Sequence, residues 1–149
     1  MKLKDKVAIV TGASAGMGRD IAYLFAKEGA TVYAVARRLE RLEELANSAK
    51  DLEGKIIPVA ADLTSKEAAE NIIDKAVKES GKLDILVNNA GIMDDFSPVG
   101  DVKDEMIEKL FSLNVFAPFY SMRKAVEVFL ENGGGNIINV ASIGGICGS

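Results

Sequence analysis

The sequence has no histidine, and Cys147 is its only cysteine. Without histidine, Ser-His-Asp hydrolysis, Cys-His hydrolysis and most zinc sites are excluded, so we expect no metal centre. A single cysteine cannot form an intrachain disulfide, which fits the reducing cytoplasm, and we therefore expect a cytoplasmic protein. Because no imidazole can activate its thiol, Cys147 is expected to be a small buried hydrophobic residue and not a nucleophile.

The chain also lacks an excess of basic charge and a long apolar run. It has 18 basic and 22 acidic residues, a net charge of −4, whereas sequence-independent binding to nucleic acid requires a basic face. The positively charged N-terminus is followed by only four apolar residues before a turn, which is too short for a signal peptide or a membrane span. We expect neither nucleic acid nor a membrane as a partner.

Glycines end the first apolar run. Residues 7–10 are apolar, as in a strand buried on both faces, and Gly12, Gly16 and Gly18 follow before a helical pattern begins. Gly12 permits a tight turn, Gly16 lets a pyrophosphate approach the backbone, and Gly18 lets the helix pack against the strand. The free N–H groups of the first helical turn favour an anion at this position. Three glycines alone are also compatible with a turn that binds nothing.

Short apolar stretches alternate with helical patterns along the whole chain. The stretches are residues 7–10, 31–36, 55–60, 84–87 and 136–140. This alternation predicts an α/β fold with a doubly wound, Rossmann-like parallel sheet, in which right-handed crossovers give the strand order 3-2-1-4-5. Ligands of such sheets bind beyond the carboxyl ends of the strands. Turn or polar residues stand at all the expected ends: Gly12, Arg37, Asp62, Asn88 and Ser142.

Three local features refine this pattern. Thr64 and Glu67 have the spacing of a helix capping box. Residues 102–130 are helical in pattern and apolar nearly all round, so we expect this helix to be buried or to pair with another subunit in a homodimer or homotetramer. Pro118 should kink or interrupt it.

Arginines stand where NAD-binding folds often carry an acidic residue. The second strand ends in Ala36, and Arg37 and Arg38 follow. An acid there would repel a 2′-phosphate, whereas a guanidinium can bind it with two hydrogen bonds and stack on adenine. The sequence therefore predicts NADP in preference to NAD. The alternative is that both arginines are solvated charges at a helix entry.

An ordered set of motifs resembles the short-chain dehydrogenase/reductase family. The motifs are Thr11-Gly12-x3-Gly16-x-Gly18, Asp62-Leu63, Asn88-Asn89-Ala90-Gly91, Asn114 and Ser142, and the resemblance runs from Lys6 to Ser142. Acyl-carrier-protein ketoreductases and sugar, steroid and alcohol dehydrogenases share these motifs. The resemblance implies an NADP-dependent oxidoreductase that transfers hydride reversibly between nicotinamide and a small carbonyl compound or secondary alcohol.

The resemblance also implies a role for each motif. Gly12, Ser14, Gly16, Met17 and Gly18 would hold the pyrophosphate and the nearby ribose, Arg37 and Arg38 the 2′-phosphate, Asp62 and Leu63 the adenine, and Asn88, Ala90 and Gly91 the ribose and the central sheet. Asn114 would anchor a water of the proton relay, and Ser142 would bind the substrate oxygen. Alternatively, Asn114 is a satisfied polar group at a helix distortion, and Ser142 is a loop hydroxyl.

One part of the family pattern does not follow Ser142. The catalytic Tyr-x3-Lys pair is expected beyond residue 149, so we interpret residues 1–149 as a dinucleotide-binding domain truncated after the fifth strand, which binds cofactor without turnover. Tyr120 and Lys124 have the same spacing but precede Ser142, and we expect them to be a packing tyrosine and a solvated lysine. The alternatives are a non-catalytic NADP-binding or regulatory module, and a structural interaction domain that binds no cofactor.

Overall fold

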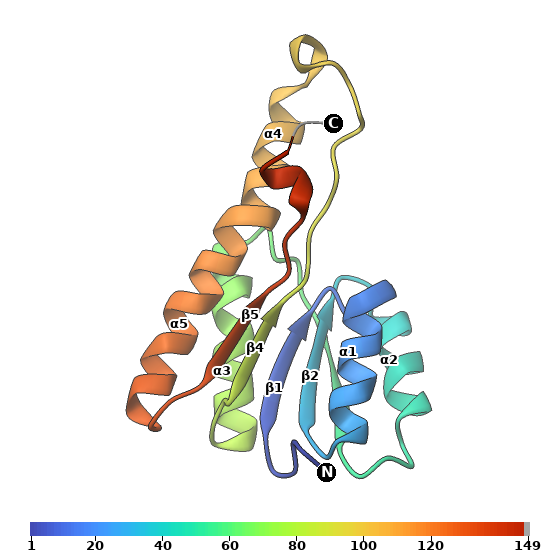
Figure 1. Ribbon diagram of the computed structural model, residues 1–149, viewed down its shortest axis with the longest axis vertical. Helices are drawn as coiled ribbons and strands as arrows, with labels where there is room; N and C mark the ends of the chain where they lie inside the picture. The colour runs from blue at the N-terminus through green and yellow to red at the C-terminus, as the bar shows by residue number, and fades with distance from the viewer. Residues whose placement is uncertain (148–149) are drawn as a thin grey trace.

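A five-stranded parallel sheet forms the centre of the computed structural model, which describes residues 1–147 (Figure 1). Its strands are β1 (Val7–Thr11), β2 (Thr31–Ala36), β3 (Lys55–Ala60), β4 (Ile85–Asn88) and β5 (Asn136–Asn139). They lie in the order β3-β2-β1-β4-β5, and each neighbouring pair is parallel. The predicted strand order is therefore confirmed. Parallel pairing also brings the carboxyl ends of all the strands to one edge.

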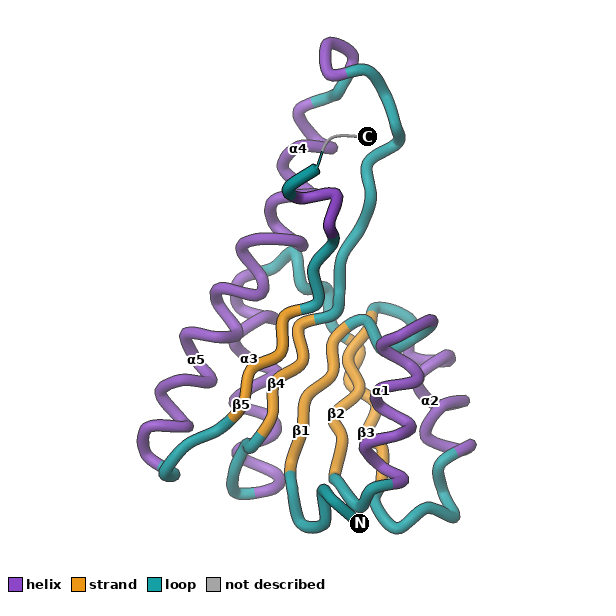
Figure 2. The backbone as a smooth tube through the Cα atoms, in the orientation of Figure 1, coloured by secondary structure: helices purple, strands orange, loops and turns teal. Residues whose placement is uncertain are grey.

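Helices cover both faces of the sheet and make three layers (Figure 2). Helices α1 (Gly16–Lys27) and α2 (Leu39–Ser48) bury Ala22 and Leu42 against one face. Helices α3 (Lys66–Ser80) and α5 (Ala117–Glu131) bury Ile73 and Phe129 against the other. The alternation of strand residues between the two clusters follows the two-residue period of a strand. Within residues 1–147, no helix combines the length and the apolarity needed to cross a membrane.

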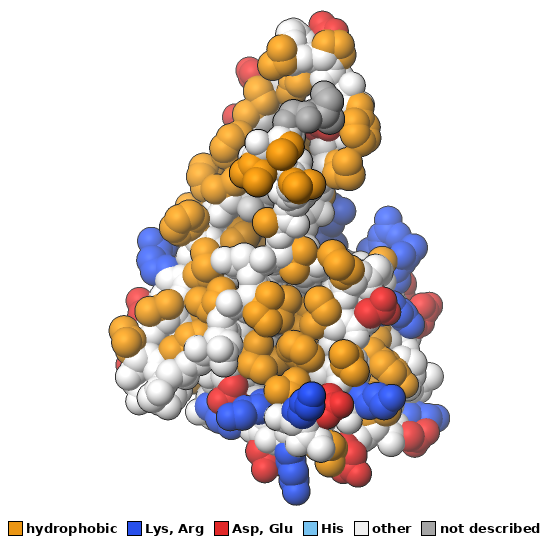
Figure 3. Space-filling view, in the orientation of Figure 1, with side chains coloured by type: hydrophobic (Ala, Val, Ile, Leu, Met, Phe, Trp, Pro, Cys, Tyr) orange, Lys and Arg blue, Asp and Glu red, His pale blue; other side chains and the backbone are white. Residues whose placement is uncertain are grey.

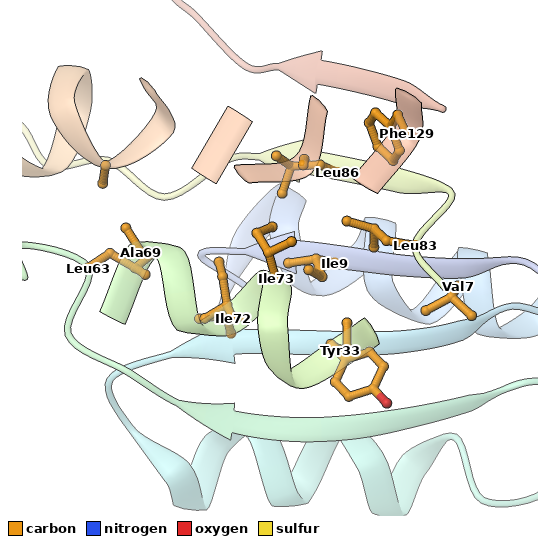
Figure 4. Packing of buried hydrophobic residues seen from close by; sticks show 14 residues of the cluster. Val7, Ile9, Tyr33, Leu63, Ala69, Ile72, Ile73, Leu83, Leu86 and Phe129 are labelled. Carbon is orange, nitrogen blue, oxygen red and sulfur yellow. The ribbon is translucent and has the colours of Figure 1, made fainter. Parts of the chain in front are cut away.

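The α3 and α5 side of the core is built around the middle strands. Figure 4 shows Ile9 of β1, Leu86 of β4 and Ile73 of α3 close together, and Ile9, Leu86 and Ile73 have no exposed surface. Tyr33 lies at the margin of this cluster, where its hydroxyl and the Ser80 hydroxyl are 2.7 Å apart, so the buried phenol is satisfied. Apolar burial thus holds α3 and α5 on this side of the sheet, and the Tyr33–Ser80 hydrogen bond adds a polar contact between β2 and α3.

The apolar region before β5 is divided into three helical parts. A 3-10 turn (Val99–Asp101) precedes α4 (Asp104–Phe111), a π-helical segment (Ser112–Phe116) and α5. The Ala117 N–H donates to the Ser112 carbonyl, five residues back. Pro118 has no N–H to give to the Asn114 carbonyl, so an α-helix cannot continue through this point. The predicted interruption at Pro118 is confirmed, and it takes the form of a π segment.

Two smaller predictions are wrong. The cap of α3 is Ser65, whose hydroxyl accepts the Ala68 N–H at 3.3 Å, because Thr64 is engaged with Asp62 instead. Cys147 is exposed, since it follows a 3-10 turn (Ile143–Gly145) that packs against no core cluster of the described residues. The 102–130 region buries one face of α5 but leaves Phe119 and Leu130 65% and 81% exposed, so of the two alternatives predicted for it, pairing with another subunit stays a prediction.

Candidate cofactor-binding site

The carboxyl ends of β1 and β4 are joined by one buried hydroxyl. Thr11 Oγ1 accepts the main-chain N–H groups of Asn89 and Ala90, both at 3.0 Å, and donates to the Val87 carbonyl at 3.4 Å. The Asn89 amide nitrogen donates to the Gly12 carbonyl at 3.3 Å. These bonds fix the two strand ends at which the predicted ligand would bind. Thr11 and Asn89 belong to recognised motifs, but no sequence pattern indicates that they join the two strands.

The glycine loop leaves its backbone open on one side only. Gly12 and Gly16 have φ values of 65° and 56°, in the left-handed region that favours glycine. A Cβ atom on Gly12 would lie 2.9 Å from Ala90 Cα, and one on Gly18 would collide with the Gly12 carbonyl, so these glycines pack the loop against its neighbours. A Cβ on Gly16 would meet no atom within 4 Å, and Ala15 gives no side-chain cap to α1. The backbone at Gly16 is therefore accessible to an anion, as a pyrophosphate site requires.

A pocket opens above these strand ends. It is lined by Gly12, Ser14, Val35, Ala36, Arg37, Ala61, Asp62, Leu63, Thr64, Ala90, Gly91, Ile92, Lys109 and Leu113. The structure thus brings together predicted site residues from β1, β2, β3 and β4 that lie far apart in the sequence. Gly16, Met17 and Gly18 form the first turn of α1, where the Met17 side chain is exposed and Gly18 is buried. Asn88 lies behind the pocket at the end of β4 and is buried.

A second, polar pocket adjoins the first. Its lining consists of Ser14, Arg37, Arg38 and Arg41. Ser14 and Arg37 line both pockets, so the two share a wall. Across the described residues 1–147, none of the three guanidinium groups lies within 4.0 Å of a carboxylate. The adjoining pocket is therefore a cluster of positive charge without an internal counter-ion.

Asp62 stands at the end of β3 as an ionised acceptor. Its Oδ1 accepts the Thr64 hydroxyl at 2.7 Å and the Thr64 N–H at 3.0 Å. These hydrogen bonds lower the pKa of Asp62, and the charges of Arg37 and Lys109 lower it further. Both bonds end on the same oxygen. The carboxylate can therefore accept from a nucleobase amine with its other oxygen.

Lys109 and Leu113 belong to the pocket, although they were not predicted from the sequence. They lie near the end of α4 and in the π segment and complete the lining of the pocket. Their spacing of four residues was a usable signal, because side chains at i and i+4 share a helix face. What the sequence did not reveal is that this face covers the strand ends.

Asn114 and Ser142, which the family resemblance places near the substrate carbonyl, lie outside the strand-end pocket. The Asn114 amide holds both main-chain groups of Ile92: its Oδ1 accepts the N–H at 2.9 Å, and its Nδ2 donates to the carbonyl at 2.8 Å. Ser142 Oγ accepts the Gly144 N–H at 3.1 Å. Asn114 also lines a further cavity with Asn88, Ala90, Asn139, residues of α5 and the two residues that follow β5. Asn114 and Ser142 are thus not among the residues that line the first pocket.

Asn88 is tied to the neighbouring strand. Its amide nitrogen donates to Asn139 Oδ1 at 3.0 Å, and the Asn139 amide contacts the Met122 sulfur at 3.4 Å. Asn88 and Asn139 are register partners of β4 and β5. This pair supports the predicted contribution of Asn88 to the central sheet.

Tyr120 and Lys124 are engaged with α3. The Tyr120 ring lies 5.6 Å from Lys66 Nζ and 5.4 Å from the Arg123 guanidinium carbon, and Lys124 Nζ pairs with Asp74 at 3.5 Å. Ser121, in the same helix turn, donates to the Ala69 carbonyl at 2.7 Å. Tyr120 and Lys124 therefore belong to the packing between α3 and α5.

A family model described as short chain dehydrogenase matches residues 6–149. The chain belongs to the short-chain dehydrogenase family. This is a family of oxidoreductases that bind NAD or NADP. The recognised motifs therefore identified the family correctly.

Curated relatives in this family have different substrates in their names. The chain is 37% identical over 146 residues to a 3beta-hydroxysteroid dehydrogenase of Eggerthella lenta, covering 97% of this chain and 56% of that protein. It is 36% identical over 149 residues to a 3-oxoacyl-[acyl-carrier-protein] reductase of Thermotoga maritima, covering all of this chain and 60% of that protein. The chain thus spans less than two thirds of the length of these relatives.

Solved structures of short-chain oxidoreductases share the fold. A metagenomic short-chain oxidoreductase in complex with NADP is 31% identical, with a TM-score of 0.93 over 97% of this chain and 66% of that one. An NAD+-bound xylitol dehydrogenase is 30% identical, with a TM-score of 0.92 over all of this chain and 57% of that one. Both cofactors therefore occur among structures similar to this short-chain dehydrogenase.

Proposed function

We propose that this chain is the NADP-binding portion of an oxidoreductase that acts reversibly on a carbonyl compound or a secondary alcohol. The observation that carries the preference for NADP is the arginine pocket beside the strand-end pocket. An adenosine in the first pocket would direct its 2′ substituent past Ser14 and Arg37. A phosphate there would meet guanidinium groups, while a 2′-hydroxyl would leave them without a partner.

The remaining nucleotide contacts follow from the pocket walls. Asp62 would accept from the adenine amine, and Leu63 with Leu113 would flank the ring. Ser14 and the open backbone from Gly12 to Gly18 would bind the pyrophosphate and the nearby ribose, with Met17 alongside. Asn88, Ala90 and Gly91 would line the nicotinamide ribose. The strand-end pocket supports the assignments on the adenosine side, the open backbone at Gly16 supports the pyrophosphate site, and a cavity that shares Ala90 with that pocket supports the position of the nicotinamide ribose.

On the carbonyl side, two residues have free polar groups for the reaction. Because its amide is held by Ile92, Asn114 would offer its main-chain carbonyl, which Pro118 cannot bond, to the water of a proton relay. Ser142 accepts from Gly144 but keeps its own proton, which it would donate to the substrate oxygen. A bound nicotinamide supplies or accepts the hydride.

Turnover would also require a proton donor of suitable pKa. Lowering the pKa of a phenol from about 10 to about 7 takes roughly 4 kcal/mol, which an adjacent ammonium helps to supply. Tyr120 and Lys124 are committed to α3, so we propose that residues 1–149 bind NADP without turning over a carbonyl substrate.

Titration tests the proposal. NADPH and NADH are titrated separately into the purified chain, and binding is followed by calorimetry. We expect NADPH to bind at least about tenfold more tightly, because hydrogen bonds to charged groups contribute about 1.5 kcal/mol or more. Equal affinities would contradict the NADP assignment, and no binding of either would favour a structural interaction domain.

We also propose a homodimer or homotetramer formed through the α4–α5 region. Ile107, Phe111, Phe116 and Phe119 are 44% to 65% exposed along it, and Figure 3 shows apolar side chains on its visible face. Sedimentation should give a dimer or tetramer that Phe119→Asp dissociates. A monomeric wild-type chain would contradict this assembly.

A further inference from the structure

Arg41 lies beside Arg37 and Arg38 without a role in the contacts described so far. We propose that Arg41 is a third determinant of cofactor specificity, whose guanidinium binds the 2′-phosphate of NADP(H) together with Arg37 and Arg38. The proposal rests on the proposed function, because it concerns the same nucleotide site. Its chemistry is that of a phosphate monoester dianion on a ribose.

The backbone brings Arg41 back toward the strand end. Arg38 is extended, with φ of −93° and ψ of 100°, and α2 begins directly after it at Leu39. Arg41 therefore belongs to the first turn of α2. Side chains in an α-helix lean toward the helix N-terminus, so Arg41 reaches back over the residues that precede the helix. This direction accounts for its presence with Ser14 in the wall of one pocket.

The charge of the cluster argues for an anionic ligand. Arg37, Arg38 and Arg41 line the same small pocket, and no carboxylate of residues 1–147 lies within 4.0 Å of any of the three. Three like charges side by side repel one another, and a ligand that carries about two negative charges relieves this repulsion. An adenosine with a free 2′-hydroxyl has no such charge, so the third arginine would act on NADP(H) alone.

The shared wall connects this charge to the nucleotide. Ser14 and Arg37 line both the strand-end pocket and the arginine pocket, whereas Arg38 and Arg41 line only the latter. Arg37 can therefore contact both adenosine and phosphate, and its loss would weaken both cofactors. Arg41 is separated from the adenosine pocket, which predicts an effect confined to ligands that carry the 2′-phosphate.

Substitution of Arg41 tests this division. Affinities of the purified chain are measured for NADPH and NADH, and for 2′,5′-ADP and 5′-AMP as probes that differ only in the 2′-phosphate. Arg41→Ala should weaken NADPH and 2′,5′-ADP about tenfold and leave NADH and 5′-AMP within about twofold. Arg41→Lys should recover part of the loss, because the charge is kept but the paired hydrogen bonds are not. Lys50→Ala, which removes an exposed positive charge just beyond α2, should change none of the four affinities.

The outcomes separate this inference from the proposed function. If the wild-type chain prefers NADPH and Arg41→Ala keeps that preference, the role of Arg41 is wrong while the proposed function stands. If the wild-type chain binds NADPH and NADH equally, the proposed NADP preference fails first. If Arg41→Ala weakens all four ligands alike, Arg41 supports the fold or the adenosine pocket, which contradicts a phosphate contact; Arg41→Gln, a good helix former, repeats this arm if the alanine variant fails to fold.

Discussion

Strands β1 and β5 belong to the same parallel sheet but differ in almost every other respect. All residues of β1 are buried, since β2 and β4 flank it and helices cover both of its faces. In β5, an edge strand, Ile137 is half-buried and the other residues are exposed, with Ile138 at 47%. The nucleotide pocket lies over the covered part of the sheet, and Ser142 follows the open part. The roles that we propose in cofactor binding and in carbonyl chemistry therefore fall in regions that differ in burial.

The largest expected difference between the regions concerns core substitutions. Ile9→Ala in β1 should lower the free energy of unfolding by about 4 kcal/mol, because it opens a cavity in a site with no exposed surface. Ile138→Ala in β5 should cost less than about 1 kcal/mol, since its side chain is already half in water. Urea unfolding of both variants measures the two values. Similar losses would show that the two strands do not differ as described.

The junction between β1 and β4, within the covered region, gives a more specific test. Thr11→Val keeps the shape of the side chain but removes the hydroxyl that accepts the Asn89 and Ala90 N–H groups. We expect a loss of about 2 kcal/mol in unfolding free energy, because buried donors are left without an acceptor, together with weaker NADPH binding. Thr11→Ser retains the hydroxyl and is the matched control. If valine and serine behave alike, the hydroxyl does not join β1 to β4.

The smallest predicted effect is a change in the pKa of the Asp62 carboxyl, in the covered region. Thr64→Val removes the hydroxyl bond that is the largest cause of the lowered pKa of Asp62, so that pKa should rise toward its ordinary value of 3.8. A carboxyl with a lowered folded pKa stabilises the fold above its unfolded pKa, and this contribution is lost as pH falls through the folded pKa. The variant should therefore lose the ionised Asp62 at a higher pH than the wild type does.

Titration of the Asp62 carboxyl by NMR measures this shift, and Thr64→Ser, which can keep the hydroxyl bond, is its control. An unchanged pKa in the valine variant would mean that the Thr64 main-chain N–H alone holds the carboxylate.

Most of the structure of the covered region could be predicted from the sequence. Apolar runs and their intervening helical stripes predicted the strand order, and strands 31–36 and 55–60 have the predicted bounds. For residues 31–36 the reason is burial, because a strand covered on both faces leaves an uninterrupted apolar signal. Arg37 and Asp62 were placed at strand ends by the same logic, and both line the pocket. The roles assigned to these residues stay predictions.

The features that the sequence did not reveal depend on tertiary contacts. Lys109 and Leu113 reach the pocket only because α4 and the π segment pass over the strand ends, and nothing local to residues 104–116 indicates that path. Arg41 enters the arginine pocket because of where α2 begins. Thr64 looked like a helix cap, but a two-residue turn to Asp62 competes for its hydroxyl, and Ser65 caps the helix instead.

A crystal structure of the chain with NADPH tests the central claim most directly. We expect adenine between Leu63 and Leu113, the pyrophosphate over the backbone at Gly16, and the 2′-phosphate among Arg37, Arg38 and Arg41. A nucleotide bound elsewhere, or a 2′-phosphate that points into solvent away from these arginines, would contradict it.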